Sequence, residues 1–296
     1  MKRSILIFLI SVMLFSCRNS SDEQTYTSGS TNVLVDESFA PIIEDQAYVF
    51  QSIYSKAQLN LVCKPENELM QLFLDDSIRV AILSRMLTKE EAKFYENRKI
   101  KIRTTRFAID GIALITHQSS LDSTTTVIDV LNVLQGKSSK IKNLIFDNPN
   151  SSTVRYFKEM AGVKVLPNKG VYALKSTSAV INYVYNNPGS IGVVGVNWMQ
   201  QPDVSLEQIV AHLKILGIKN LPNKPGSDAY YKPSQNDIAL GFYPFTRSLY
   251  VINCQGGAGL GAGFASFLAG ERGQRIILKS GLLPDQVPSR EVMIKK

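Results

Sequence analysis

The chain has 296 residues, of which 44% are hydrophobic and 20% are charged. This composition is typical of a globular protein with a full core, and the length suits one or two α/β domains. The formal net charge of +8 favours the approach of anions in general. The basic residues are spread along the chain and form no dense Lys/Arg run interleaved with aromatic residues, so we expect no nucleic acid among the partners.

The N-terminus predicts export. Lys2 and Arg3 precede an apolar run over residues 5–15, which is too short to span a bilayer and typical of a signal peptide. Leu14-Phe15-Ser16-Cys17 resembles a bacterial lipobox, which favours lipidation of Cys17 over the alternative of a plain secretory signal with an incidental cysteine. We therefore expect localisation in the periplasm or at the cell surface, with the protein lipid-anchored to a membrane. The predicted division is a lipoprotein signal peptide over 1–16 and a lipid-anchored tether over 17–30.

Cysteine and histidine are scarce. Cys63 and Cys254 remain after Cys17, and the sequence leaves open whether they form a disulfide or are two separately buried thiols. No CxxC or HExxH pattern occurs, and His117 and His212 are the histidines of the chain. We therefore expect no metal site and no cofactor.

Hydrophobic patterns alternate between strand and helix along the chain. Ile43, Ala47, Phe50 and Tyr54 form an apolar helical stripe, for which Ser38 is the expected N-cap. The pattern predicts an α/β protein with two parallel-sheet lobes. The expected strands cover 31–35, 59–63, 78–83, 107–116, 144–146 and 190–196, with a strand pair within 238–252. The expected helices cover 66–76, 89–98, 127–134, 154–161, 178–185, 264–268 and 273–279.

The stretch Asp147-Asn148-Pro149-Asn150-Ser151-Ser152-Thr153 lies between a predicted strand and a predicted helix. Such a junction presents unpaired backbone N–H groups, hydroxyls and the positive end of a helix dipole, which together suit an oxyanion. The alternative is an ordinary N-cap, since serine and threonine are favoured there in any case.

Two other stretches invite a functional interpretation. Asp110-Gly111 interrupts an apolar run, and a charge in a buried strand is costly without partners. The glycines of residues 256–263 resemble a phosphate-binding loop only superficially, because no Lys-Ser/Thr pair follows them. We interpret that stretch as a loop-to-helix junction where backbones approach closely.

With these elements placed, the chain resembles the substrate-binding lipoproteins of phosphate ABC importers, the PstS-like family of type II periplasmic binding proteins. The resemblance runs from about Thr31 to the C-terminus. It includes Asp-Glu-Ser-Phe-Ala-Pro, an Ile-Asp-Gly-Ile-Ala strand, Ser-Ser-Thr in place of a Ser-Gly-Thr anion loop, and Tyr-Pro-Phe-Thr-Arg-Ser-Leu-Tyr near the end. The matching stretches are residues 36–41, 81–88, 109–113, 151–153, 190–195, 243–250 and 273–284.

The resemblance implies two Rossmann-like lobes that close on a ligand in a central cleft. Lobe 1 is expected to comprise residues 31–113 and 245–296, and lobe 2 residues 114–244. The implied ligand is inorganic phosphate or a related oxyanion, the implied partner is an ABC permease in the inner membrane, and no catalysis is expected. The implied ligand-binding residues are Ser38, Phe39, Ser84, Arg85, Asp110, Ser151, Ser152 and Thr153.

The resemblance also implies how specificity arises. A carboxylate in the cleft accepts the proton that phosphate carries and repels sulfate, and the candidates are Asp110 and, less directly, Glu37. The chain departs from the family pattern at Ser152, at Asp147 where the family often has arginine, and at Asn67-Glu68. Arg85, Arg106 or Arg155 are candidates to compensate, although Arg155 also fits a solvated helix charge.

Two rival functions remain open from the sequence. A phosphatase or esterase is disfavoured because Gly-x-Ser-x-Gly and a metal-ligand cluster are both absent from the sequence. The alternative is a surface lipoprotein of the same fold that acts as a sensor or adhesion protein without phosphate transport, which the acidic departures leave open beside the solute-binding function.

Overall fold

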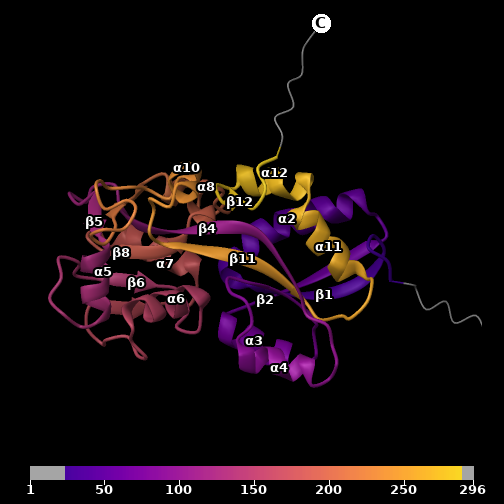
Figure 1. Cartoon of the computed structure of the whole chain (residues 1–296). Helices are drawn as coiled ribbons and strands as arrows, with labels where there is room; N and C mark the ends of the chain where they lie inside the picture. The colour runs from indigo at the N-terminus through magenta and orange to yellow at the C-terminus, as the bar shows by residue number, and fades with distance from the viewer. Residues whose placement is uncertain (1–23, 289–296) are drawn as a thin grey trace, which may run out of the picture.

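The computed structural model describes residues 24–288, so the predicted signal peptide, Cys17 and most of the predicted tether lie outside the described residues. Its elements form two halves joined by long crossing strands (Figure 1). The first half contains β1 (Gly29–Asp36), α2 (Ala40–Ile53), β2 (Ala57–Lys64), α3 (Glu66–Leu74), β3 (Val80–Leu83), α4 (Lys89–Glu96), α11 (Leu260–Ala269), α12 (Glu271–Lys279) and the 3-10 turn η1 (Glu37–Phe39).

The second half contains the middle of the chain. Its main parallel strands are β6 (Leu144–Phe146), β7 (Val171–Ala173) and β8 (Ile191–Gly195), with β6 between the other two. The remaining elements are β5 (Thr124–Thr126), α5 (Val127–Leu134), α6 (Ser152–Ala161), α7 (Thr177–Asn186), α8 (Asn197–Gln200), α9 (Glu207–Val210), β9 (Leu213–Ile215), β10 (Gly217–Lys219) and α10 (Gln235–Ala239).

Two antiparallel strands join the halves. β4 (Arg103–His117) pairs with β11 (Thr246–Asn253) over its first part and with β8 and β9 over its last part. The strand order is β2-β1-β3-β11-β4-β8-β6-β7, while β12 (Leu283–Pro284) and β9 also pair with β4, and β10 pairs with β5. A sheet that continues through two crossing strands lets the halves tilt against each other without breaking either core.

Each half is buried on both faces of its sheet. Val33 and Val35 of β1 pack with Phe50 and Phe264 under α2 and α11, whereas Leu34 packs with Phe73 under α3. This separation follows from the period of two along a strand. In the second half, one apolar cluster lies under α5 and α6 and another under α7 and α9. The predicted α/β class is therefore confirmed.

Side-chain caps begin five of the α-helices in residues 24–288, namely α4, α5, α6, α7 and α10. Thr88 and Glu91 form a reciprocal capping box at α4, and Ser151 accepts the backbone N–H of Val154 at α6. Three expectations differ in detail, among them the start of the helix expected over 178–185, for which Ser178 was the expected cap. Asp36, and not Ser38, caps the turn after β1, since its carboxylate accepts the N–H of Ser38. Ser176, and not Ser178, caps α7. The expected strand pair within 238–252 is the end of α10 followed by the single strand β11.

The two described cysteines do not form a disulfide. Cys63 and Cys254 are separate free thiols and pack in clusters on opposite faces of the first sheet. A Cβ at Gly263 would lie 1.7 Å from the backbone oxygen of Tyr26, which confirms the close approach expected of the glycine-rich junction. Within residues 24–288, no helix combines the length and the apolar character needed to cross a membrane.

Candidate functional site

The hydroxyl groups expected to bind an anion meet between the halves. Ser38 lies in η1 directly after β1, and Ser152 and Thr153 begin α6 directly after β6. The Ser38 hydroxyl oxygen is 3.4 Å from that of Ser152 and 3.5 Å from that of Thr153, and all three side chains are buried. Ligands of open α/β sheets bind outside the carboxyl ends of the strands, and this meeting point follows the ends of β1 and β6. We call these three residues the hydroxyl cluster.

Arg247 of β11 reaches the same point. Its Nη1 donates to Ser152 Oγ at 2.8 Å and to Thr153 Oγ1 at 3.3 Å, and its side chain is only 2% exposed. The guanidinium carbon lies 4.5 Å above the ring of Phe39, a cation–π distance. Its Nη2 is buried without a hydrogen-bond partner. A buried guanidinium with an unused donor suits a bound oxyanion.

Asp110 faces Arg247 across the two crossing strands. The two residues are directly paired in the β4–β11 register, and Arg247 Nε donates to Asp110 Oδ2 at 2.9 Å. Burial raises the pKa of Asp110, and the adjacent guanidinium of Arg247 opposes that rise. Asp110 Oδ1 is buried without a partner. Asp110 therefore orients Arg247 and keeps one oxygen available to accept a proton.

Three further carboxyl groups lie around the hydroxyl cluster. Burial raises the pKa of Asp36, with Arg247 opposing the rise, and Asp36 Oδ2 has no partner. Burial raises the pKa of Asp147 to about 7, while the hydrogen bond from Ser151 and the charge of Arg247 oppose it. Burial, with Asp147 and Asp36 nearby, raises the pKa of half-buried Glu37 to about 7. The surroundings of the cluster are thus rich in acceptors as well as donors.

Ser84 and Arg85 lie in a second polar cluster beside the first. Arg85 Nε donates to Glu66 at 3.0 Å, and its Nη1 donates to Glu91 at 2.7 Å. The Ser84 hydroxyl accepts from Arg155 Nη2 at 3.1 Å. The structure therefore places Arg85 between carboxylates, and no hydrogen bond described for residues 24–288 joins it to the hydroxyl cluster.

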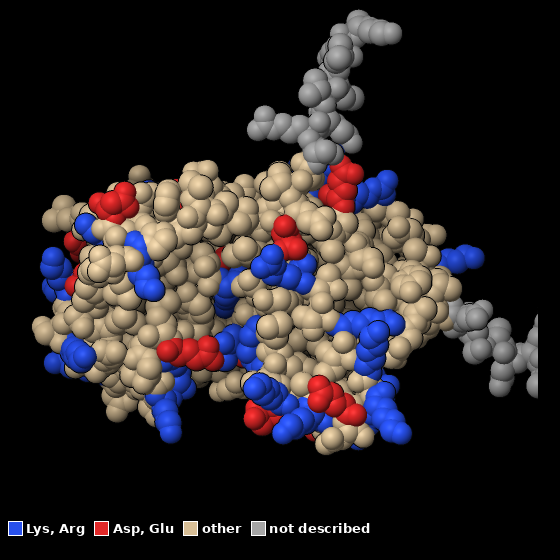
Figure 2. All heavy atoms as spheres, viewed as in Figure 1, with Lys and Arg blue, Asp and Glu red and all other residues tan. Residues whose placement is uncertain are grey.

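The remaining basic candidates have separate partners. Arg106 donates to Asp285 at 2.5 Å on the exposed side of β4. Arg155 is not the solvated helix charge that its position suggested, because it binds Glu66 and Ser84 of the opposite half. Asn67 joins the same seam through backbone and side-chain hydrogen bonds to Asn150. Figure 2 shows basic and acidic side chains along this seam.

Sequence reasoning missed Arg247 as a site residue. Its stretch, Tyr243–Tyr250, was noticed only as part of the family resemblance. The sequence contained an electrostatic signal for this pair. Arg247 and Asp110 each lie in an apolar strand, and a buried charge requires a partner of opposite charge, which each residue provides for the other.

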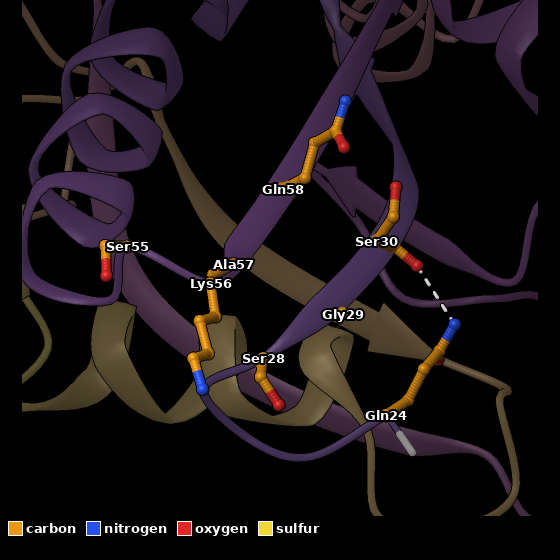
Figure 3. A pocket seen from close by; sticks show the side chains of 8 residues that line it. All are labelled: Gln24, Ser28, Gly29, Ser30, Ser55, Lys56, Ala57 and Gln58. Carbon is orange, nitrogen blue, oxygen red and sulfur yellow. Dashed lines mark hydrogen bonds between the residues drawn. The ribbon is translucent and has the colours of Figure 1, made fainter. Parts of the chain in front are cut away.

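A separate hollow of about 710 Å³ lies at the other end of the first sheet (Figure 3). Ser28, Ser30, Lys56 and Gln58 line it where β1 and β2 begin, and Gln24 donates to the carbonyl of Ser30. None of its lining side chains is both buried and unpartnered. β1 separates this hollow from the hydroxyl cluster, so we assign it no part in ligand binding. Within residues 24–288, no group of three or more His, Cys, Asp or Glu side chains is arranged to hold a metal ion.

Comparison with known proteins identifies the family to which the chain belongs. The PBP superfamily domain family matches residues 20–272. The phosphate-binding protein PstS of Staphylococcus epidermidis is 22% identical over 258 residues, which cover 81% of this chain and 74% of the relative.

Solved structures agree on the fold. A putative phosphate ABC transporter substrate-binding protein with bound phosphate from Clostridium perfringens superposes with a TM-score of 0.70 at 18% identity, covering 87% of this chain and 100% of the other. An ABC-type phosphate transport receptor from Vibrio cholerae gives a TM-score of 0.61 at 16% identity, with 86% and 99% covered. The predicted type II periplasmic-binding-protein fold is confirmed.

Proposed function

The chain belongs to the PBP superfamily domain family, and from that premise we propose that it is an extracytoplasmic receptor that captures phosphate, or a similar small oxyanion, between its halves. The PstS relatives and the phosphate-bound structure from Clostridium perfringens support this ligand class. Members of this family bind a solute without transforming it, so the chain is a binding protein and not an enzyme.

One observation carries the proposal: donors from both halves and from a crossing strand converge on one buried point. Ser38 comes from the first half, Thr153 from the second, and Arg247 from β11 between them. Hydroxyls at a helix N-terminus stabilise an anion through oriented dipoles, and one arginine adds a directed charge. Because the donors belong to both halves, the anion is bound fully only when the halves are closed.

The crossing strands supply the hinge in this proposal. We place the boundary between the lobes within β4 and just before β11, which assigns residues 31–113 and 245–296 to lobe 1 and residues 114–244 to lobe 2. Opening about these strands separates Ser38 from Thr153 and releases the anion. Ser84 is a candidate for a further contact, while Arg85 acts through Glu66 in the closed state.

Delivery and attachment complete the proposal. An ABC permease is the expected recipient of the bound anion, as it is for the relatives named as transporter components. We propose that Cys17 carries a lipid that holds the receptor at the membrane after removal of residues 1–16. Mass spectrometry of the membrane-bound chain, with Cys17→Ser as control, tests this attachment.

Calorimetric titration of the ligand-free chain with phosphate, sulfate and small carboxylates tests the ligand. We expect phosphate to bind, and we expect Ser38→Ala combined with Thr153→Ala to weaken binding at least tenfold without unfolding the protein, because two of the converging hydroxyls are lost. The matched control changes two exposed residues, Ser123→Ala with Thr124→Ala. Equal affinity in both double variants contradicts the assigned site. A folded wild type that binds no anion points instead to a surface protein of the same fold without transport.

A further inference from the structure

Asn197 has a buried side-chain amide without a partner. The residue begins α8, directly after β8, and it is 1% exposed. Neither its Nδ2 nor its Oδ1 has a hydrogen-bond partner among residues 24–288. Buried amides are normally hydrogen-bonded, because an unpaired one gives up its bonds to water without replacement. This amide therefore needs a partner that the described part of the chain does not supply.

The strand register brings Asn197 to the centre of the site. In the antiparallel pairing of β4 with β8, Ile112 is opposite Gly195. Asn197 is two residues beyond Gly195, so it falls beside Asp110, which is two residues before Ile112. Asp110 is in turn paired with Arg247 of β11. The three polar side chains thus come from neighbouring positions across the crossing strands.

Gly195 leaves room for the Asn197 amide. A Cβ at Gly195 would lie 2.5 Å from Asn197 Oδ1, which is too close for a real side chain, and 3.5 Å from Asp110 Oδ2. The amide and the carboxylate therefore lie against the same face of this glycine. The φ angle of Gly195 is not in the left-handed region, so the close approach of the amide, and not the backbone conformation, requires glycine here.

The residue after Asn197 contacts the hydroxyl cluster. Trp198 Nε1 donates to the carbonyl oxygen of Ser38 at 3.0 Å, and α8 contacts α2 of the first half. Consecutive residues of α8 therefore lie against both parts of the site, Asn197 beside the Asp110–Arg247 pair and Trp198 beside the hydroxyl cluster.

Two buried donors beside Asp110 are unused. They are Asn197 Nδ2 and Arg247 Nη2, which have no acceptor within residues 24–288. An oxyanion presents several oxygen acceptors to such donors. The amide differs from the guanidinium because it is neutral, so it adds a directed hydrogen bond to the ligand without adding charge to the site.

We infer that Asn197 is a further ligand-contacting residue, whose side-chain amide donates to one oxygen of the bound oxyanion, and that Gly195 positions it by leaving room for the amide. This inference rests on the proposed function and adds a contact from α8 to it. Arg247 Nη2 bonds another oxygen of the same ligand. Because Asn197 belongs to the second half and Ser38 to the first, the contact adds to those that hold the halves closed on the anion.

Calorimetry of the full chain with inorganic phosphate tests the contact. Asn197→Leu keeps the volume of the side chain and removes its polar atoms, so we expect the Kd for phosphate to rise roughly tenfold or more. The thermal midpoint of the ligand-free variant is not expected to fall, because the lost amide had no partner. Asn168→Leu, at an exposed residue of the same half, is the matched control and is expected to keep the wild-type Kd. Asn197→Ala repeats the measurement with a side chain that cannot clash.

The outcomes separate a ligand contact from a structural role. A wild-type Kd in folded Asn197→Leu or Asn197→Ala overturns the inference while leaving phosphate binding intact. A thermal midpoint that falls in both ligand-free variants assigns the amide to the fold and also overturns the inference. Failure of the wild-type chain to bind phosphate overturns the proposed function itself.

Gly195→Ala tests whether this glycine acts through the amide. The added Cβ displaces Asn197 Oδ1, so we expect the substitution alone to weaken phosphate binding roughly tenfold and to have no further effect in combination with Asn197→Ala. Gly257→Ala is the control, since no atom lies within 4 Å of its added Cβ. Losses that add up in the double variant contradict the role of Gly195.

Discussion

Arg155 on α6 binds Glu66 on α3 across the seam between the halves, with Nε 2.6 Å from Oε1 and Nη2 3.1 Å from Oε2. Glu66 is almost fully buried, and it also accepts from Arg85 of its own half. The ion pair can form only when the halves are closed, because its members belong to different halves. It therefore stabilises the closed state without contacting the hydroxyl cluster.

Arg155→Met is expected to weaken phosphate binding roughly tenfold, since loss of an interlobe ion pair of about 1–2 kcal/mol shifts the population toward the open state. Calorimetry measures the affinity, and small-angle scattering of the ligand-free chain measures the opening. Arg106→Met is the matched control, because it breaks an ion pair with Asp285 that lies within one half. Equal affinities in the two variants contradict the closing role of Arg155.

Arg247→Lys tests the arginine at the centre of the site. Lysine keeps the charge but loses the planar fork that bonds Asp110, Ser152 and Thr153 together. We expect phosphate affinity to fall roughly 100-fold, which corresponds to about 2.7 kcal/mol. Arg103→Lys, on the exposed start of β4, is the control. The fluorescence of Trp198, which donates to the carbonyl of Ser38, offers an independent readout of ligand binding. Retention of wild-type affinity in Arg247→Lys removes Arg247 from the site.

The sequence predicted those features that depend on neighbouring residues. The α/β alternation and the hydroxyls at the start of α6 follow from local patterns, and the structure contains both. The turn after β1 was misassigned by two residues because Asp36 and Ser38 are both good caps, and only the three-dimensional path decides between them.

Features that depend on strand register or on closure were not predictable in this way. The pairing of Arg247 with Asp110 requires the register of β11 against β4, over a separation of 137 residues. The bond from Arg155 to Glu66 requires both halves to be brought together, over 89 residues. A single sequence contains the charges of these residues but not the distances between them, so Arg85 appeared free to bind a ligand although Glu66 and Glu91 engage it.

Gly263→Ala tests the close approach of α11 to the chain before β1. Alanine normally stabilises a helix by about 1 kcal/mol relative to glycine, but here its Cβ would lie 1.7 Å from the Tyr26 oxygen. We expect the cost of overpacking, about 1–3 kcal/mol, to exceed this gain, so that the thermal midpoint of unfolding is lower than in the wild type. Gly257→Ala is the control within the same glycine-rich stretch, since no atom lies within 4 Å of its added Cβ. Equal stability of the two variants contradicts the packing described for α11.

The stability of the ligand-free chain is expected to fall as the pH rises toward neutrality. The pKa of Asp147 is raised from its usual 3.8 to about 7, so the folded state holds a proton that the unfolded chain releases. Stability from this group is present in full below the unfolded pKa and is lost as the pH rises through about 7. Urea unfolding between about pH 4 and pH 8 measures this change. Asp147→Asn is expected to flatten the dependence of stability on pH, and the control Asp122→Asn, which changes an exposed carboxylate, is expected to leave it unchanged. An unaltered slope in Asp147→Asn shows that another group causes the dependence, and Glu37, whose pKa is also raised to about 7, is the first candidate.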